Sequence, residues 1–122
     1  MTPIHRLFAV RGAVCCENTK KSISELVPGL YREIIEKNSI PEPDIVSVLF
    51  SVTGDLTVLN PATALRNAGM AASVPLFCTA EPEIEGALPG VIRILLTCYA
   101  EIQPDHIYMN GAEILRPDIP KK

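Results

Sequence analysis

Two arginines lie inside otherwise apolar segments, where a charged side chain needs a specific reason to be. Arg11 lies within FAVRGAV and Arg93 within VIRILLT. A guanidinium group stays charged, and burying it without a partner is very costly, so something anionic has to meet each one. An internal carboxylate or an exposed strand edge would satisfy a single arginine of this kind. Two of them in separate strands of one sheet also suggest a pocket that binds an anion.

A thiol and a carboxylate stand close together in the segment PLFCTAE, as Cys78 and Glu81. The carboxylate can accept a hydrogen bond from a hydroxyl group or act as a general base. The simpler alternative is that Glu81 begins a polar loop with Glu83 and Glu85. Cys78 is more simply explained as a small buried hydrophobic residue than as a nucleophile.

Three further side chains are candidates for the same pocket: Tyr108, Arg66 and Arg116. Each also has an ordinary explanation, which is packing for the tyrosine and a solvated surface charge for either arginine. The sequence indicates no particular role for His5 or His106. Several arginines with one carboxylate, one tyrosine and no metal-binding triad favour a small polyanionic ligand such as a dicarboxylate. Two histidines and four cysteines without a C-x-x-C motif are too few for a usual zinc site, and the cysteines are expected to be free thiols.

The elements that must position these residues can be predicted from the hydrophobic pattern. Strands are expected over residues 4–13 (ended by Gly12), 44–53, 73–79 and 91–99. A long amphipathic helix is capped by Thr19 and runs to about Asn38, with a kink or local break at Pro28. A short helix begins at Pro61 and is closed by Gly69.

The C-terminal part, residues 106–115, is predicted to form a hairpin that turns at Asn110-Gly111. The element order β-α-β-α-β-β-β then predicts an α/β (α+β) fold, a mixed five-stranded sheet with one long and one short helix on one face. Strand 91–99 is apolar on both faces, so its second face is expected to meet another subunit. This pattern predicts a homo-oligomer.

Composition narrows the class of protein. The chain has 122 residues, of which 48% are hydrophobic and 20% charged, which predicts one folded domain over 1–122 and excludes disorder. A net charge of -3, no cluster of basic residues and few aromatic residues argue against binding to nucleic acids or anionic membranes. The N-terminus lacks the features of a signal peptide and no segment is apolar enough to span a membrane, so a cytoplasmic protein is expected.

Six short segments, taken in order and spacing, resemble one enzyme family. They are VRGA (10–13), SVTGDL (51–56), PATALR (61–66), VPLFCTAE (74–81), GVIRILL (90–96) and LRPD (115–118). The sequence is similar to the monofunctional bacterial chorismate mutases of the trimeric pseudo-α/β-barrel class. The resemblance implies a homotrimer with active sites at subunit interfaces, and the conversion of chorismate to prephenate on the route to phenylalanine and tyrosine. It implies no cofactor and no metal.

The resemblance also assigns roles. Arg11 matches the arginine that binds a substrate carboxylate. Arg93 matches the one that meets the ether oxygen and a carboxylate. Glu81 falls on the residue that binds the substrate hydroxyl, with Cys78 beside it, and Tyr108 aligns with a tyrosine that helps to hold a carboxylate.

The remaining matches concern the rim of the pocket. Arg66 corresponds to an arginine at the pocket mouth, and Leu115 and Arg116 match tail positions that cover the pocket. Two positions depart from the family: Asn60 stands where some members carry an aromatic side chain, and Thr63 where a lysine can occur. Two alternatives stay open, a trimeric enzyme of the imine/enamine deaminase type and a trimer that binds a dicarboxylate without catalysis.

Overall fold

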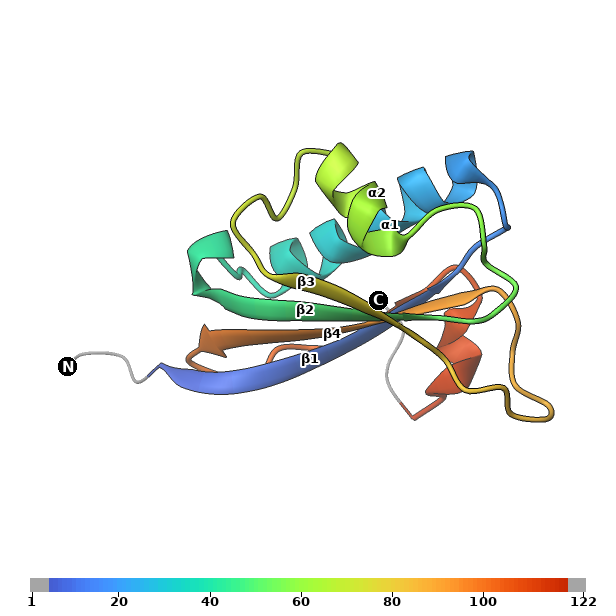
Figure 1. Ribbon diagram of the computed structural model, residues 1–122. Coiled ribbons are helices and arrows are strands. Elements are labelled where there is room, and N and C mark those ends of the chain that lie inside the picture. Colours follow the sequence, from blue (N-terminus) through green and yellow to red (C-terminus); the bar gives the residue numbers. More distant parts are fainter. Residues whose placement is uncertain (1–4, 119–122) are drawn as a thin grey trace.

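The computed structural model describes residues 5–118 and contains one sheet with two α-helices on one of its faces (Figure 1). The elements are β1 (Arg6–Cys15), α1 (Lys20–Lys37), β2 (Ile45–Val52), α2 (Pro61–Asn67), β3 (Leu76–Ala80), β4 (Val91–Ala100) and β5 (Ile107–Met109), with short 3-10 helices at Glu42–Asp44 and Ala112–Leu115. The predicted mixed five-stranded sheet with one long and one short helix is thus confirmed. No helix in the described part of the chain has the length and hydropathy needed to cross a membrane.

The strand order is β3-β2-β4-β1-β5, so the central strand is the fourth in the sequence. β4 pairs antiparallel with both β1 and β2, whereas β3 pairs parallel with β2 and β5 parallel with β1. Four strands therefore run in one direction and β4 runs against them. As a result, the C-terminal ends of these four strands and the N-terminal end of β4 lie at the same end of the sheet.

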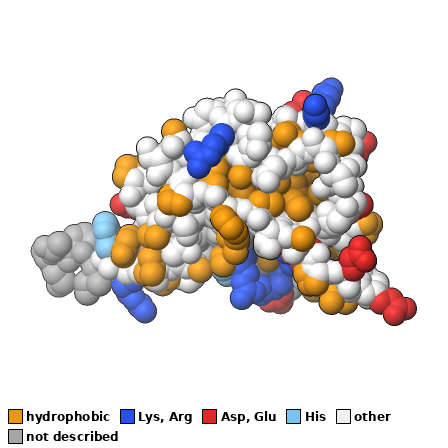
Figure 2. All heavy atoms as spheres, viewed as in Figure 1, with side chains coloured by type: hydrophobic (Ala, Val, Ile, Leu, Met, Phe, Trp, Pro, Cys, Tyr) orange, Lys and Arg blue, Asp and Glu red, His pale blue; other side chains and the backbone are white. Residues whose placement is uncertain are grey.

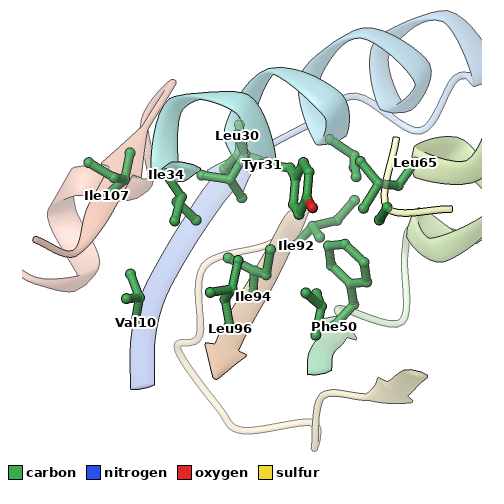
Figure 3. Close-up of a cluster of buried hydrophobic side chains, with 14 of the residues drawn as sticks. Val10, Leu30, Tyr31, Ile34, Phe50, Leu65, Ile92, Ile94, Leu96 and Ile107 are labelled. Carbon is green, nitrogen blue, oxygen red and sulfur yellow. The ribbon is translucent and has the colours of Figure 1, made fainter. Parts of the chain in front are cut away.

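The core lies between the helices and the sheet. Figure 3 shows Leu30, Tyr31 and Ile34 of α1 facing side chains of the strands, among them Ile92 and Phe50, and all five are fully buried. These positions match the helical and strand periods that the sequence pattern indicated. The opposite face of the sheet is not covered by the helices, so polar side chains on it remain accessible.

The long helix begins and ends where the sequence predicts. The Thr19 side chain accepts a hydrogen bond of 3.0 Å from the Ser22 N–H, and Asn38 is the C-terminal cap. Of the kink or local break predicted at Pro28, the break is wrong, because the helix continues through this buried residue. Proline cannot donate the hydrogen bond to the carbonyl four residues earlier, but Ser24 at that position is exposed, so water can take its place.

The predicted hairpin over 106–115 is also wrong. Asn110 and Gly111 have the positive φ angles of 52° and 95° that suit a tight turn, but a 3-10 helix comes after them instead of a strand. The Asn110 side chain donates a 2.7 Å hydrogen bond to the Cys15 carbonyl, and Ala112 is buried in a small cluster with Ala13. The turn thus returns the chain to β1, and among the described strands β5 pairs with β1 alone.

Some strand boundaries differ from the prediction as well. The first strand does not end at Gly12 but continues to Cys15, because the missing side chain of Gly12 makes room for close packing rather than for a turn. The third strand begins at Leu76, three residues after the predicted start, since residues 72–74 form turns and a bend.

Candidate functional site

A hollow of about 310 Å³ lies on the sheet face that the helices leave open. Its polar lining comes from Arg11, Arg93, Ser51, Tyr108 and Arg116, and Leu49 and Leu95 contribute an apolar part. Figure 2 shows basic side chains gathered on the side of the molecule away from the helices, with hydrophobic side chains around them. The combination of three guanidinium groups with an apolar surface suits a small anionic ligand that also carries a hydrocarbon ring.

Strand register brings the polar residues together. Ala13 of β1 is paired with Arg93 of β4 on one side and with Tyr108 of β5 on the other. Paired residues project to the same face, and Arg11 lies two residues before Ala13, so all of these side chains share the open face. Ala13 is small and leaves space between its larger neighbours. Ser51 of β2 is paired with Arg93 from the other side.

Arg93 and Glu81 form an ion pair, with 3.0 Å between Arg93 Nε and Glu81 Oε1. Glu81 comes directly after β3, and its backbone N–H donates a 2.8 Å hydrogen bond to the Val52 carbonyl, which fixes the residue beside the end of β2. The side chains of Arg93 and Glu81 are 43% and 22% exposed, so the pair faces solvent. An internal carboxylate was one of the partners that the sequence allowed for Arg93. Glu81 is that carboxylate, and it is also one of the predicted site residues.

Arg11 is held through its backbone. Its N–H donates a 3.0 Å hydrogen bond to Nδ1 of His106, while its side chain is exposed and forms no ion pair within residues 5–118. Of the two ordinary explanations that the sequence left open for Arg11, an internal carboxylate is therefore not found among residues 5–118, and the side chain is exposed instead. Burial, followed by the charges of Arg11 and Arg116, holds the pKa of His106 below its ordinary value.

The C-terminal segment closes one side of the hollow. Leu115 and Tyr108 pack together against the small buried cluster that contains Ala13. The guanidinium of Arg116 forms two hydrogen bonds to Asp118, of 2.8 and 3.1 Å. These bonds raise the pKa of Arg116, with a smaller contribution from Tyr108, and lower the pKa of the Asp118 carboxyl. Arg116 is therefore a permanent positive charge at the rim.

Three predicted site residues lie away from the hollow within this chain. Cys78 packs partly buried against the core, and burial raises the pKa of its thiol, as expected of a small hydrophobic residue. Arg66 of α2 donates hydrogen bonds of 3.2 to 3.4 Å to three carbonyls in the next turn, those of Ala71, Ala72 and Val74. Thr63 is exposed on the same helix. The structure of one chain does not bring these three residues to the others.

Two polar residues of the site were not predicted. The sequence indicates no role for His106, and Ser51 stands out only as part of the SVTGDL segment. Ser51 Oγ donates a 2.5 Å hydrogen bond to Glu81 Oε1. Both residues act through contacts between segments far apart in the sequence, which no local pattern signals.

No group of three or more His, Cys, Asp or Glu side chains within residues 5–118 is arranged to hold a metal ion. The polar groups of the hollow are instead cationic or hydrogen-bonding groups. The arrangement can bind carboxylates through guanidinium groups, accept a hydrogen bond from a hydroxyl at Glu81, and place a positive charge beside an oxygen atom.

Comparison with known proteins gives a consistent result. The model of the family "Chorismate mutase type I" matches residues 7–119. The chain is 33% identical over 114 residues to chorismate mutase AroH of Bacillus subtilis and 36% identical over 115 residues to chorismate mutase AroH of Thermus thermophilus, with 90% of this chain aligned in each case and 90% and 93% of the relatives.

A solved structure agrees with these sequence matches. The fold superimposes on that of a chorismate mutase from Clostridium thermocellum with a TM-score of 0.82 and 36% sequence identity, over 87% of this chain and 97% of that one. Family model, relatives and fold all cover most of the chain. The chain therefore belongs to the chorismate mutase type I family.

Proposed function

We propose that this protein converts chorismate to prephenate in the hollow on the open face of the sheet. The observation that carries the proposal is a hollow with apolar walls that is lined by Arg11 and Arg93, with Glu81 paired to Arg93. Chorismate has two carboxylates, a ring hydroxyl and an ether oxygen. The site offers guanidinium groups for the carboxylates and the ether oxygen, and a carboxylate for the hydroxyl.

The reaction is an intramolecular rearrangement that needs no nucleophile, metal or proton transfer. The first contribution of the protein is to hold the substrate with its two reacting ends in contact, which is an effect of orientation. In this proposal Arg11 and Tyr108 bind a carboxylate, and Glu81 accepts a hydrogen bond from the hydroxyl. These contacts select the reactive conformer.

The second contribution is electrostatic. Negative charge develops on the ether oxygen as its C–O bond breaks, and a cation already in place there lowers the barrier. Arg93 is our candidate for this role, because its terminal nitrogens make no hydrogen bond to residues 5–118 and its Nε is anchored on Glu81. A lysine would serve less well, since a guanidinium spans two oxygen atoms in a fixed geometry.

We further propose that residues 1–122 form a single domain that assembles as a homotrimer with its active sites between subunits. The large exposed apolar side chains of the open sheet face support the assembly. In this arrangement Thr63 and Arg66, which lie away from the hollow within one chain, would be supplied by a neighbouring copy. Leu115 and Arg116 would cover the pocket, and Cys78 would pack behind Glu81.

The test is the loss of chorismate absorbance with prephenate as the product. Arg93→Ala should lower kcat by roughly 10²–10³, the usual effect of removing one preorganised donor, with a circular dichroism spectrum like that of the unchanged protein. Arg32→Ala, at an exposed arginine of α1, is the matched control and should be fully active. An unchanged kcat in Arg93→Ala would remove Arg93 from the mechanism, and a folded protein without turnover would refute the proposed function.

A further inference from the structure

One carboxylate oxygen of Glu81, Oε1, takes both the ion-pair contact with Arg93 and the hydrogen bond from Ser51. Arg93 Nε lies 3.0 Å from Oε1, and Ser51 Oγ donates a 2.5 Å hydrogen bond to the same atom. Within residues 5–118, Oε2 accepts no hydrogen bond. The carboxylate therefore has one anchored oxygen and one that is open to a ligand.

The pairing of the strands explains why the two oxygens of Glu81 differ. Ser51 is paired with Arg93 on β4 and with Thr79 on β3, so its hydroxyl lies between the strand that carries the arginine and the one that leads to Glu81. Ser51 is half-buried and lines the hollow. Its short side chain has few rotamers, which restricts the positions that the hydroxyl oxygen can take.

We propose that Ser51 is a positioning residue that orients Glu81 so that Oε2 receives the substrate hydroxyl. The inference rests on the proposed function. Without the serine hydroxyl, Glu81 would be held by Arg93 alone and could turn to bind the guanidinium with both oxygens, the geometry that a carboxylate and an arginine prefer. That rotation would withdraw Oε2 from the hydroxyl and occupy an N–H group that the ether oxygen needs.

The proposal predicts that Ser51 acts on the reaction only through Glu81. Ser51→Ala should lower kcat/KM about tenfold, the usual effect of losing one hydrogen bond to a charged group. Ser51→Thr keeps the hydroxyl and should restore most of the activity. Ser47→Ala is the matched control, since Ser47 lies four residues earlier on the same strand and outside the hollow.

The decisive experiment is a double-mutant cycle. Kinetics of chorismate turnover are measured for the unchanged protein, Ser51→Ala, Glu81→Ala and the double variant, with thermal midpoints as a check on folding. In the Glu81→Ala background the Ser51→Ala change should have no further effect, because its only target is gone. Calorimetric binding of prephenate to the same four proteins gives a second cycle that does not depend on residual turnover.

The outcomes separate this proposal from the function on which it rests. Equal losses from Ser51→Ala in both backgrounds would mean that Ser51 supports the strand and not Glu81, and would overturn the proposal. Full activity of Ser51→Ala in an otherwise working enzyme would also overturn it. Absence of turnover in the unchanged protein would instead refute the proposed function.

Discussion

At the scale of single residues, the protonation of His106 decides whether the backbone N–H of Arg11 keeps its hydrogen-bond acceptor. Its Nδ1 accepts the Arg11 N–H, so in this structure the ring is neutral and its proton is on Nε2. Burial is the main cause of its lowered pKa. Arg11 of β1 and Arg116 of the C-terminal segment lower it further, and the neighbouring Asp105 acts in the opposite direction. Protonation would remove the acceptor and add a third positive charge beside two arginines.

Stability should therefore fall with pH below the ordinary histidine pKa of 6.5. Between that value and the lower pKa of the folded state, the unfolded chain binds more protons, so the free energy of unfolding decreases as pH falls through this window. Above about pH 6.5 the contribution is fully present. Thermal midpoints between about pH 5 and 8 measure the effect.

His106→Asn is the informative variant, because the amide oxygen can accept the Arg11 N–H but does not titrate. It should remove the part of the pH dependence that is due to His106, whereas His5→Asn, at an exposed histidine, should leave it unchanged. The same pH dependence in all three proteins would contradict this account.

The residues of the site differ in how far the sequence revealed them. Arg93 was predictable because a permanent charge inside an apolar strand demands a partner, and Glu81 because it lies just past a strand in the VPLFCTAE segment. Ser51 was not, because serine is ordinary in a strand and its role comes from the register of β2 against β4. His106 contacts a residue 95 positions away, which periodicity cannot show.

At the scale of elements, β1 depends on the absence of a side chain at Gly12. A Cβ built there would lie 2.8 Å from the Ile107 carbonyl oxygen and 2.9 Å from Ile94 Cγ2. β5 is therefore able to approach β1 closely, and this approach sets Tyr108 opposite Ala13. The sequence pattern predicted that Gly12 ends a strand because glycine commonly marks a turn, while the actual reason for the glycine is packing against another element.

Gly12→Ala should destabilise the protein by about 1–3 kcal/mol, the range for overpacking a tightly filled site. It should also weaken substrate binding, since β5 would have to move away from β1 together with Tyr108. Gly29→Ala is the matched control: nothing lies within 4 Å of a Cβ at this helical position, so it should stabilise α1 by about 0.5–1 kcal/mol. Urea unfolding measures both changes, and a Gly12→Ala protein as stable as the original would refute the packing argument.

The predicted elements succeeded or failed for a common physical reason. Helix α1 and strands β2 and β4 are long segments with a clear pattern of apolar residues, so the local sequence is enough to predict them. The hairpin prediction failed because Asn110-Gly111 favours a reversal of the chain but does not determine whether a strand or a helix comes next. The burial of Ala112 against Ala13 favours the 3-10 helix at this point. Such packing between distant segments cannot be seen in a short stretch of sequence.

At the scale of the whole molecule, the open face of the sheet is unusually apolar around the hollow. Five of its large side chains are substantially exposed, namely Leu7, Leu49, Phe77, Leu95 and Tyr99, with Phe77 at 71%. Contiguous exposed apolar side chains of this kind mark surfaces that bind another protein. The proposed homotrimer would bury them between copies and complete the sites with Thr63 and Arg66.

Light scattering after size exclusion should accordingly give the mass of a trimer. Phe77→Asp should shift the protein to smaller species and reduce activity at the same time, because a buried unpaired carboxylate opposes assembly. Ile102→Asp, at a residue 78% exposed in the loop after β4, is the control and should remain trimeric. A fully active monomer would contradict both the assembly and the interfacial sites.

The central position of β4 has a consequence for how the chain reaches its native state. β1 and β2 never pair with each other and are joined only through β4, which begins at Val91. When the first 90 residues have left the ribosome, the sheet consists of one isolated strand and one parallel pair, which is too little to be stable. The sheet, its core and Arg93 therefore come into place together and late, through contacts of high sequence separation that make folding slow.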